Sequence, residues 1–172
     1  MQHLVHLNKD RRLKKIIAAQ PLYVLNKKNN VYLHLCSSII SQQLSVKVAD
    51  VIYKRFLNLY PTQKPSPQQI VSTELEVLRS VGLSNAKANY VQNVCRFFID
   101  EKITDAKLHK MENEELISYL TRIKGVGQWT VEMILMFTLG REDVFALDDL
   151  GIQQAMCKLY QFDSTDKKVL KQ

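Results

Sequence analysis

Two glycines separated by one residue, Gly125 and Gly127, stand between two apolar segments of the chain. Glycine allows backbone angles and close approaches that a side chain would block. A helix that begins directly after such a turn has N–H groups that its own hydrogen bonds leave unused, and these groups bind anions. Lys124 adds a positive charge beside the turn, and Thr130 adds a hydroxyl group. The pattern predicts a site for one phosphate, although a glycine that merely ends a helix gives the same sequence.

Two adjacent carboxylates, Asp148 and Asp149, follow the glycine turn after about twenty residues. They end an apolar stretch at residues 144–147 and precede an amphipathic segment. One aspartate at a helix start is ordinary, because it accepts hydrogen bonds from the free N–H groups there. Only one residue can occupy the N-cap position, however. Capping accounts well for Asp148, whereas a structural role and a chemical role are equally open for Asp149.

A carboxylate near a helix pair that grips a DNA phosphate is suited to breaking an N-glycosidic bond. The reaction passes through an oxocarbenium-like state whose positive charge an ionised aspartate stabilises, and the same group can orient or deprotonate water. The net charge of +7, from 24 Lys and Arg against 17 Asp and Glu, favours an anionic partner such as nucleic acid. Charge alone is not specific, because many basic proteins never bind DNA.

Helical spacing of apolar residues runs through nearly the whole chain, and strand-like alternation is missing. The sequence therefore predicts the all-α fold class, with a helical hairpin over about 112–139 around the glycine turn. Ile123 and Val126 are expected to fill the space between the two helices of the hairpin. Further helices are expected at about 8–19, 31–41, 45–59, 67–72, 74–80, 84–98 and 149–159, and from residue 163 onward.

The length of 172 residues is that of about one ordinary domain, so we expect a single helical domain over 1–172. No apolar run has the length of a membrane span, and the first residues lack a secretion signal, so neither a membrane nor secretion is expected. Cys36, Cys95 and Cys157 lie about sixty residues apart, which is the spacing of no disulfide framework, zinc site or iron–sulfur ligand set. No metal site is predicted.

The segments IKGVGQWTVEMILMF, from Ile123, and DVFALDDLGIQQAM, from Asp143, resemble the helix-hairpin-helix (HhH-GPD) glycosylases of base excision repair. They are most similar to the alkylation-repair branch, the 3-methyladenine DNA glycosylase II type. SIISQQLS at residues 38–45 and the segment at residues 82–88 resemble the same branch. The resemblance runs from about residue 10 to the end and is most specific at 120–154. It implies a monomeric DNA repair hydrolase that removes alkylated purines such as 3-methyladenine from double-stranded DNA.

The resemblance also assigns residues. Asp149 corresponds to the catalytic carboxylate, and Asp148 is then mainly a cap and a support. Residues 125–127, which are Gly125, Val126 and Gly127, correspond to the hairpin that holds the DNA phosphate. The QQLS segment corresponds to the place where the family inserts a side chain into the space left by the flipped nucleotide. We expect that side chain to be Gln43, with Leu44 as the alternative.

Trp129 decides the expected reaction subtype. Family members that also cut the strand carry a lysine two residues after the second hairpin glycine, where this chain has Trp129. Water is therefore the expected nucleophile, because Lys87 and Lys124 are displaced from that position in the pattern. On residue type alone Trp129 would belong to the core. The resemblance instead places it in the base pocket, where it attracts a cationic methylated purine, with Met133 where the family has a second aromatic residue.

The resemblance implies no required cofactor. In the family, hairpin carbonyl groups bind a monovalent cation, which here would involve Thr121, Ile123 and Val126. The missing cysteine cluster separates the chain from the branch with an iron–sulfur cluster. The chain has no room for the family's N-terminal β domain, and it ends before a further helix of the family, so we expect a truncated C-terminus. The expected location is the cytoplasm, in association with the nucleoid, in a bacterium, or the nucleus in a eukaryote.

Two other functions are consistent with the same residues. A non-catalytic helix-hairpin-helix module would bind DNA and use both aspartates only as a helix start. A glycosylase that also cuts the strand would need an amine nucleophile at an unexpected position.

Overall fold

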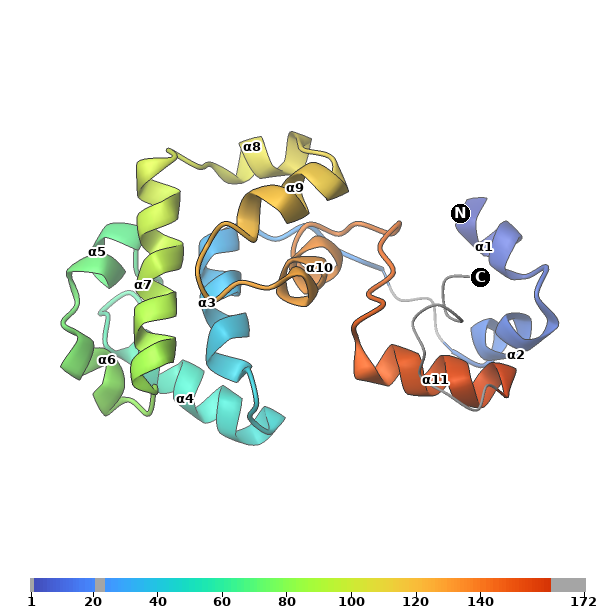
Figure 1. The fold of residues 1–172 in the computed structure, drawn as a ribbon, viewed down its shortest axis with the longest axis horizontal. Coiled ribbons are helices and arrows are strands. Elements are labelled where there is room, and N and C mark those ends of the chain that lie inside the picture. The colour runs from blue at the N-terminus through green and yellow to red at the C-terminus, as the bar shows by residue number, and fades with distance from the viewer. Residues whose placement is uncertain (1, 21–23, 162–172) are drawn as a thin grey trace. The chain divides into compact units, whose positions relative to one another are not determined.

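The computed structural model describes residues 2–20 and 24–161, and every regular element within them is an α-helix (Figure 1). The all-α prediction is therefore confirmed. The helices form two compact units. The larger one is Asn26–Phe145, and the smaller one combines the chain up to Leu25 with the chain from Ala146 onward. No helix among the described residues is long and apolar enough to cross a membrane.

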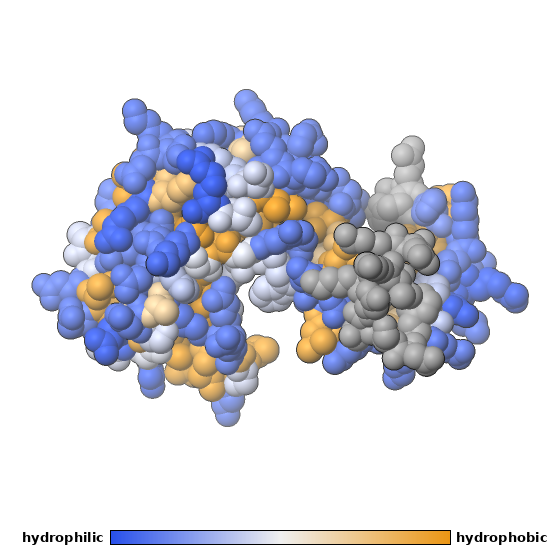
Figure 2. Space-filling view, in the orientation of Figure 1, coloured by the Kyte–Doolittle hydropathy of each residue, from blue (hydrophilic) through white to orange (hydrophobic). Residues whose placement is uncertain are grey.

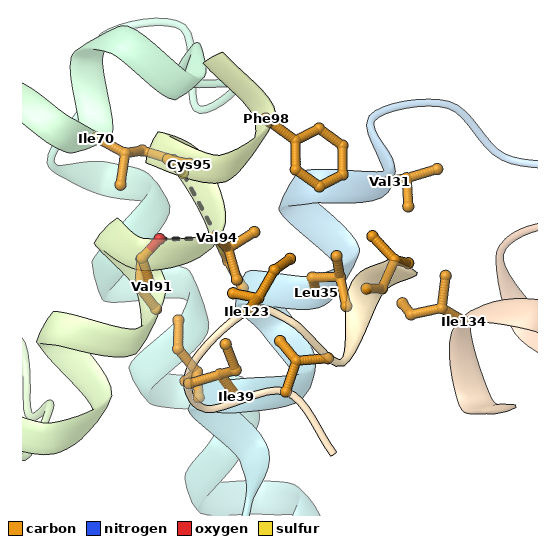
Figure 3. Close-up of a cluster of buried hydrophobic side chains, with 14 of the residues drawn as sticks. Val31, Leu35, Ile39, Ile70, Val91, Val94, Cys95, Phe98, Ile123 and Ile134 are labelled. Carbon is orange, nitrogen blue, oxygen red and sulfur yellow. Dashed lines mark hydrogen bonds between the residues drawn. The ribbon is translucent and has the colours of Figure 1, made fainter. Parts of the chain in front are cut away.

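The larger unit is built around one central helix, α3 (Val31–Ser41), which packs against α4 (Val46–Asn58), α7 (Asn85–Asp100) and α10 (Gln128–Phe137) (Figure 1). Its remaining helices are α5 (Pro67–Ser72), α6 (Leu75–Ser80), α8 (Asp105–Lys110) and α9 (Asn113–Leu120). Apolar residues at helical spacing on α3 turn inward, among them Val31, Leu35 and Ile39 (Figure 3). They meet Val91 and Phe98 of α7, which are buried as their spacing predicts.

Four of the eight helices in the larger unit begin at a residue whose side chain caps the helix. The side chains of Ser45 and Ser84 accept hydrogen bonds from the N–H groups of Val48 and Lys87, so both serines are N-caps. The helix α8 was not expected. It has six residues and buries only Leu108, so it carries no periodic apolar pattern.

Two cysteines that are distant in the sequence are neighbours in the core. The Sγ atoms of Cys36 on α3 and Cys95 on α7 lie 4.0 Å apart, and both residues are fully buried. The hydrogen bond with Cys95 and burial raise the pKa of the Cys36 thiol well above its usual value. Both residues therefore belong to the apolar core, and the raised pKa keeps the Cys36 thiol unreactive.

The smaller unit contains α1 (Gln2–Leu7), α2 (Arg11–Ala19) and α11 (Leu150–Tyr160). Asp10 caps α2, because its Oδ1 accepts hydrogen bonds from the N–H groups of Arg12 and Leu13 at 2.7 and 3.0 Å. The bond from Leu13 is the main cause of a lowered Asp10 pKa. The Tyr160 hydroxyl donates to Asp10 Oδ2 at 3.1 Å, which ties α11 to α2. The helix α1 was not expected, and the helix predicted from residue 163 lies outside the described residues.

Candidate functional site

The glycine turn joins α9 to α10 and forms the hairpin that the sequence predicts. Ile123 and Val126 are 2% and 5% exposed, so both fill the space between the helices. Gly125 has a φ of +105°, which disfavours any other residue. A Cβ atom at Gly125 would also lie 2.3 Å from the Cγ atom of Tyr90 on α7. Glycine at this position is thus required by the backbone and by the ring of Tyr90, which sequence reasoning did not include.

Gly127 differs from Gly125, because nothing within the described chain requires it to be glycine. Its φ is −95°, which any residue adopts, and a Cβ atom there would meet no atom within 4 Å. The first backbone hydrogen bond of α10 runs from the Val131 N–H to the Gly127 oxygen at 3.2 Å. The earlier N–H groups of this helix therefore lie outside its own ladder of hydrogen bonds. Open space at a helix N-terminus is the geometry that admits an anion.

The polar residues predicted around the turn are placed differently from one another. Lys124 is exposed, in agreement with a role in anion binding. Thr130 is only 3% exposed, so its side chain is buried and does not lie on the surface of the turn. The residue faces the interior because it lies four positions before Ile134, a buried residue on the same face of α10.

The helix α7 adds polar groups to the hairpin that the sequence analysis did not select. The Asn93 side chain donates from Nδ2 to the backbone oxygen of Lys124 at 3.3 Å. A pocket of about 350 Å³ lies here, lined by Ala86, Asn89, Tyr90, Asn93 and Lys124. Asn89 and Asn93 are four residues apart and therefore share one face of α7. The spacing of Asn89 and Asn93 was the signal in the sequence that could have identified them.

The predicted insertion segment forms a tight turn between α3 and α4, which we call the 42–44 turn. Gln43 has a φ of +58°, a left-handed conformation that costs energy in residues other than glycine and is enriched at functional sites. Its side chain is exposed, and Leu44 is 37% exposed. Figure 2 shows apolar atoms gathered over α4, where Val46 and Val48 are exposed. An apolar surface thus continues from Leu44 along α4.

Trp129 lies beside the 42–44 turn. Trp129 and the 42–44 turn line one pocket of about 440 Å³ together with Ser41, and no other described residue lines it. Trp129 is 37% exposed, so the alternative that it belongs to the core is wrong. Met133 follows one turn later on α10, is partly buried, and lies outside the lining of this pocket. The structure therefore brings Gln43, Leu44 and Trp129 together, although they are far apart in the sequence.

The paired aspartates lie at the start of α11, in the smaller unit. The N-cap is Asp149, whose Oδ1 accepts a hydrogen bond from the Ile152 N–H at 2.9 Å, so the expectation that Asp148 is the cap is wrong. Asp149 is the last extended residue before the helix, with φ −75° and ψ 117°, which is the conformation of an N-cap. A Cβ atom at Gly151 would lie 3.1 Å from Asp149 Oδ1. Glycine therefore keeps this oxygen uncrowded.

The segment before the aspartates is held by a side chain of α11. Gln153 is 9% exposed, and its Nε2 donates to the backbone oxygen of Leu147 at 2.6 Å. Asp149 is consequently fixed on both sides, by the helix that follows it and by this bond behind it. Among the described residues, no three His, Cys, Asp or Glu side chains are placed to hold a metal ion.

Comparison with known proteins identifies the family of proteins that shares these features. The profile of the HhH-GPD superfamily of base excision DNA repair proteins matches residues 36–172, which is most of the chain. The chain belongs to this superfamily. The resemblance that the hairpin and the paired aspartates indicated is therefore confirmed. HhH-GPD relatives with curated names also agree with the alkylation-repair branch.

DNA-3-methyladenine glycosylase 1 of Schizosaccharomyces pombe is 34% identical to this HhH-GPD chain over 170 residues, which are 97% of this chain and 75% of that protein. The putative DNA-3-methyladenine glycosylase YfjP of Bacillus subtilis is 32% identical, and the match covers 81% of this chain and half of YfjP. A solved structure of the S. pombe 3-methyladenine glycosylase Mag1 in complex with abasic DNA superimposes with a TM-score of 0.84 at 32% identity. That match covers 95% of this chain and 82% of Mag1.

Proposed function

We propose that this protein is a monofunctional DNA glycosylase that hydrolyses the N-glycosidic bond of alkylated purines, such as 3-methyladenine, in duplex DNA. The observation that carries the proposal is the pocket between Trp129 and the 42–44 turn, because it joins an exposed aromatic ring to the predicted insertion segment. The names of the relatives support the substrate class. Abasic DNA, which Mag1 binds in its structure, is the DNA product of such a reaction.

The hairpin is the proposed binding site for the DNA backbone. Phosphate oxygens would accept hydrogen bonds from N–H groups at the start of α10, where the open space beside Gly127 permits close approach. The exposed Lys124 adds positive charge. These contacts carry no sequence information, which suits an enzyme that must search any sequence for damage.

The 42–44 turn and Trp129 are the proposed base-flipping apparatus. Gln43, or Leu44 in its place, enters the space that the flipped nucleotide leaves in the duplex, and the unstacking costs least at a damaged pair. The electron-rich ring of Trp129 stacks on the extrahelical base. A methylated purine such as 3-methyladenine carries a positive charge, so a cation–π attraction favours it over an ordinary base.

Asp149 is the proposed catalytic carboxylate. As the bond between the base and the sugar C1′ breaks, its electron pair leaves with the base and positive charge develops on the sugar. An ionised Asp149 stabilises that charge and accepts a proton from the water that adds to C1′. Its place at the N-terminus of α11 favours the ionised form, because the helix dipole is positive there.

A monovalent cation at the hairpin would be compatible with the residues present. The Ile123 oxygen accepts the Val126 N–H at 3.0 Å, whereas the oxygens of Thr121 and Val126 accept no hydrogen bond from the described residues. Three carbonyl groups of one turn, two of them without a donor, are suited to such an ion. The ion would supply positive charge close to the phosphate site.

A base-release assay tests the proposed function. We expect the wild-type protein to release free 3-methyladenine, detected by chromatography, from methylated duplex DNA faster than the buffer alone. The DNA strand should stay intact until it is treated with alkali, and borohydride should trap no protein–DNA adduct, because residue 129 is Trp and not Lys. DNA binding without base release would favour the non-catalytic module, and a trapped adduct would favour the glycosylase that also cuts the strand.

A further inference from the structure

We propose that Lys87 is a positioning residue that holds the 42–44 turn in the shape that presents Gln43 and Leu44 beside Trp129. The inference rests on the proposed function, since it concerns how that function's insertion segment is kept ready. It also gives a role to the segment at residues 82–88, which the phosphate site and the catalytic carboxylate do not use. Lys87 is half-buried on α7, in the larger unit, together with the turn that it contacts.

The ammonium group of Lys87 joins the end of α3 to the turn that follows it. Its Nζ donates to the backbone oxygen of Ile40 at 2.8 Å and to that of Gln42 at 2.7 Å. The last carbonyl groups of a helix have no partner within the helix. Around this end, the oxygens of Ile39 and Ser41 accept backbone N–H groups of the turn. Lys87 supplies the donor for Ile40, so the turn and the lysine together complete the end of α3.

The bond to Gln42 bears directly on the left-handed conformation of Gln43. The Gln42 oxygen belongs to the peptide group that precedes Gln43, so its direction and the φ angle of Gln43 change together. If that peptide group rotated, Gln43 would move from its φ of +58° to the negative values that non-glycine residues prefer. Lys87 holds the oxygen in place with a charged donor and so opposes the rotation. The strained conformation persists because its surroundings fix it.

The location of Lys87 in its own helix argues that this contact, and not helix stability, accounts for the residue. Lys87 is the third residue of α7, and Ser84 accepts its backbone N–H at 3.2 Å. A positive charge in the first turn of a helix is unfavourable, whereas the same charge at a helix C-terminus is favourable. Its charge is thus poorly placed on α7 and well placed at the end of α3. Partial burial also lowers the Lys87 pKa, which is a cost of this position.

A second contact fixes the other side of the turn. The Gln42 side chain donates from Nε2 to the backbone oxygen of Gly125 in the hairpin, at a long distance of 3.5 Å. The 42–44 turn is therefore fastened to α7 through Lys87 and to the phosphate-binding hairpin through Gln42. Of these two links, only that of Lys87 is charged and short, so we expect it to dominate the shape of the turn.

The test compares Lys87→Met, which keeps the apolar stem and removes the donors, with Lys87→Arg, which keeps charged donors. Lys54→Met is the matched control, because Lys54 is an exposed lysine of α4 whose ion pair is with Asp50 only one turn away. Three quantities are measured: amide hydrogen exchange at residues 43 and 44, the affinity for undamaged duplex DNA, and the single-turnover rate of 3-methyladenine release. The first two do not depend on the proposed chemistry.

For Lys87→Met we expect faster amide exchange at residues 43 and 44 and base release slowed by about 10-fold to 100-fold, as for a misplaced active group. DNA affinity should stay near that of Lys54→Met, and Lys87→Arg should recover most of the rate. Equal exchange and equal base release in Lys87→Met and Lys54→Met would overturn the proposal. So would a uniform loss of thermal stability and DNA affinity, which indicates a merely structural lysine.

If Lys87→Met does not fold, Lys87→Gln replaces it in the comparison with Lys87→Arg. We then expect amide hydrogen exchange at residue 43 to be slower in Lys87→Arg than in Lys87→Gln. Equal exchange in these two would overturn the proposal. Failure of the proposed function is a separate outcome. A wild-type protein that releases no base, while Lys87→Met still exchanges faster than Lys54→Met at residues 43 and 44, would contradict the enzymatic activity and leave the role of Lys87 in the turn intact.

Discussion

At the scale of single residues, Asp149 combines a structural and a proposed chemical role. It caps α11 through Oδ1, and the proposed reaction requires its ionised carboxylate. The sequence located the helix start within one residue but assigned the cap to Asp148. Which of two adjacent aspartates caps a helix depends on the residue at which the backbone leaves the extended conformation. Residue types do not reveal that point, because both aspartates are good caps.

The double role of Asp149 gives a prediction for stability. Asn and Asp cap helices about equally well, so Asp149→Asn should keep the wild-type melting temperature. Asp149→Ala removes the acceptor for the Ile152 N–H and should lower the free energy of unfolding by about 1 kcal/mol, which is a few degrees in melting temperature. Thermal denaturation followed by circular dichroism measures both variants. Equal melting temperatures for the Asn and Ala variants would contradict the capping role.

At the scale of elements, the hairpin shows what a sequence pattern can and cannot predict. Its helices and the buried residues Ile123 and Val126 follow from apolar spacing and from the glycines. The sequence did not show that Gly125 and Gly127 are glycine for different reasons. The reason at Gly125 depends on Tyr90, a residue of α7 that is distant in the sequence. The six-residue helices α1 and α8 were missed, whereas α5 and α6, which have the same length, were expected.

The two glycines give a matched pair of variants within one turn. Gly125→Ala forces a side chain into a positive φ and against the Tyr90 ring, so we expect about 2–4 kcal/mol of lost stability. Gly127→Ala meets no atom of the chain and should change stability by less than about 0.5 kcal/mol. Its methyl group would stand in the proposed phosphate site and reduce DNA affinity by about tenfold, or ~1.4 kcal/mol. Chemical denaturation and DNA titration separate the two effects. Wild-type affinity in Gly127→Ala would argue against a phosphate at this turn.

At the scale of the whole molecule, the spacing of apolar residues predicted the class of fold, and charge predicted only the kind of partner. The net charge of +7 indicates an anion without locating it, whereas the structure puts the exposed Lys124 beside the hairpin. The sequence could not predict which residues that are distant along the chain lie close together in the fold. Neither the pocket of Trp129 and the 42–44 turn nor the 4.0 Å approach of Cys36 and Cys95 follows from spacing, because α3, α7 and α10 must first pack together.

The charge gives a prediction for salt dependence. DNA affinity should fall linearly on a plot of log affinity against log salt concentration, with a slope of about −0.9 for each phosphate that is neutralised. Lys124→Gln should make the slope less negative by about one phosphate contact. Its base-release rate at saturating protein should stay close to the wild-type rate, because Lys124 acts in binding. An unchanged slope would remove Lys124 from the proposed DNA interface.

Asp149 is the proposed catalytic carboxylate of the hydrolysis. The most direct test of this role is the single-turnover release of 3-methyladenine from duplex DNA at saturating protein, with Asp149→Asn compared with Asp148→Asn and the wild type. We expect Asp149→Asn to be slower by at least about 10²–10³-fold, since a charge-stabilising group is lost, while its affinity for the DNA is retained. Asp148→Asn should stay close to the wild type. Wild-type release by Asp149→Asn would contradict this role.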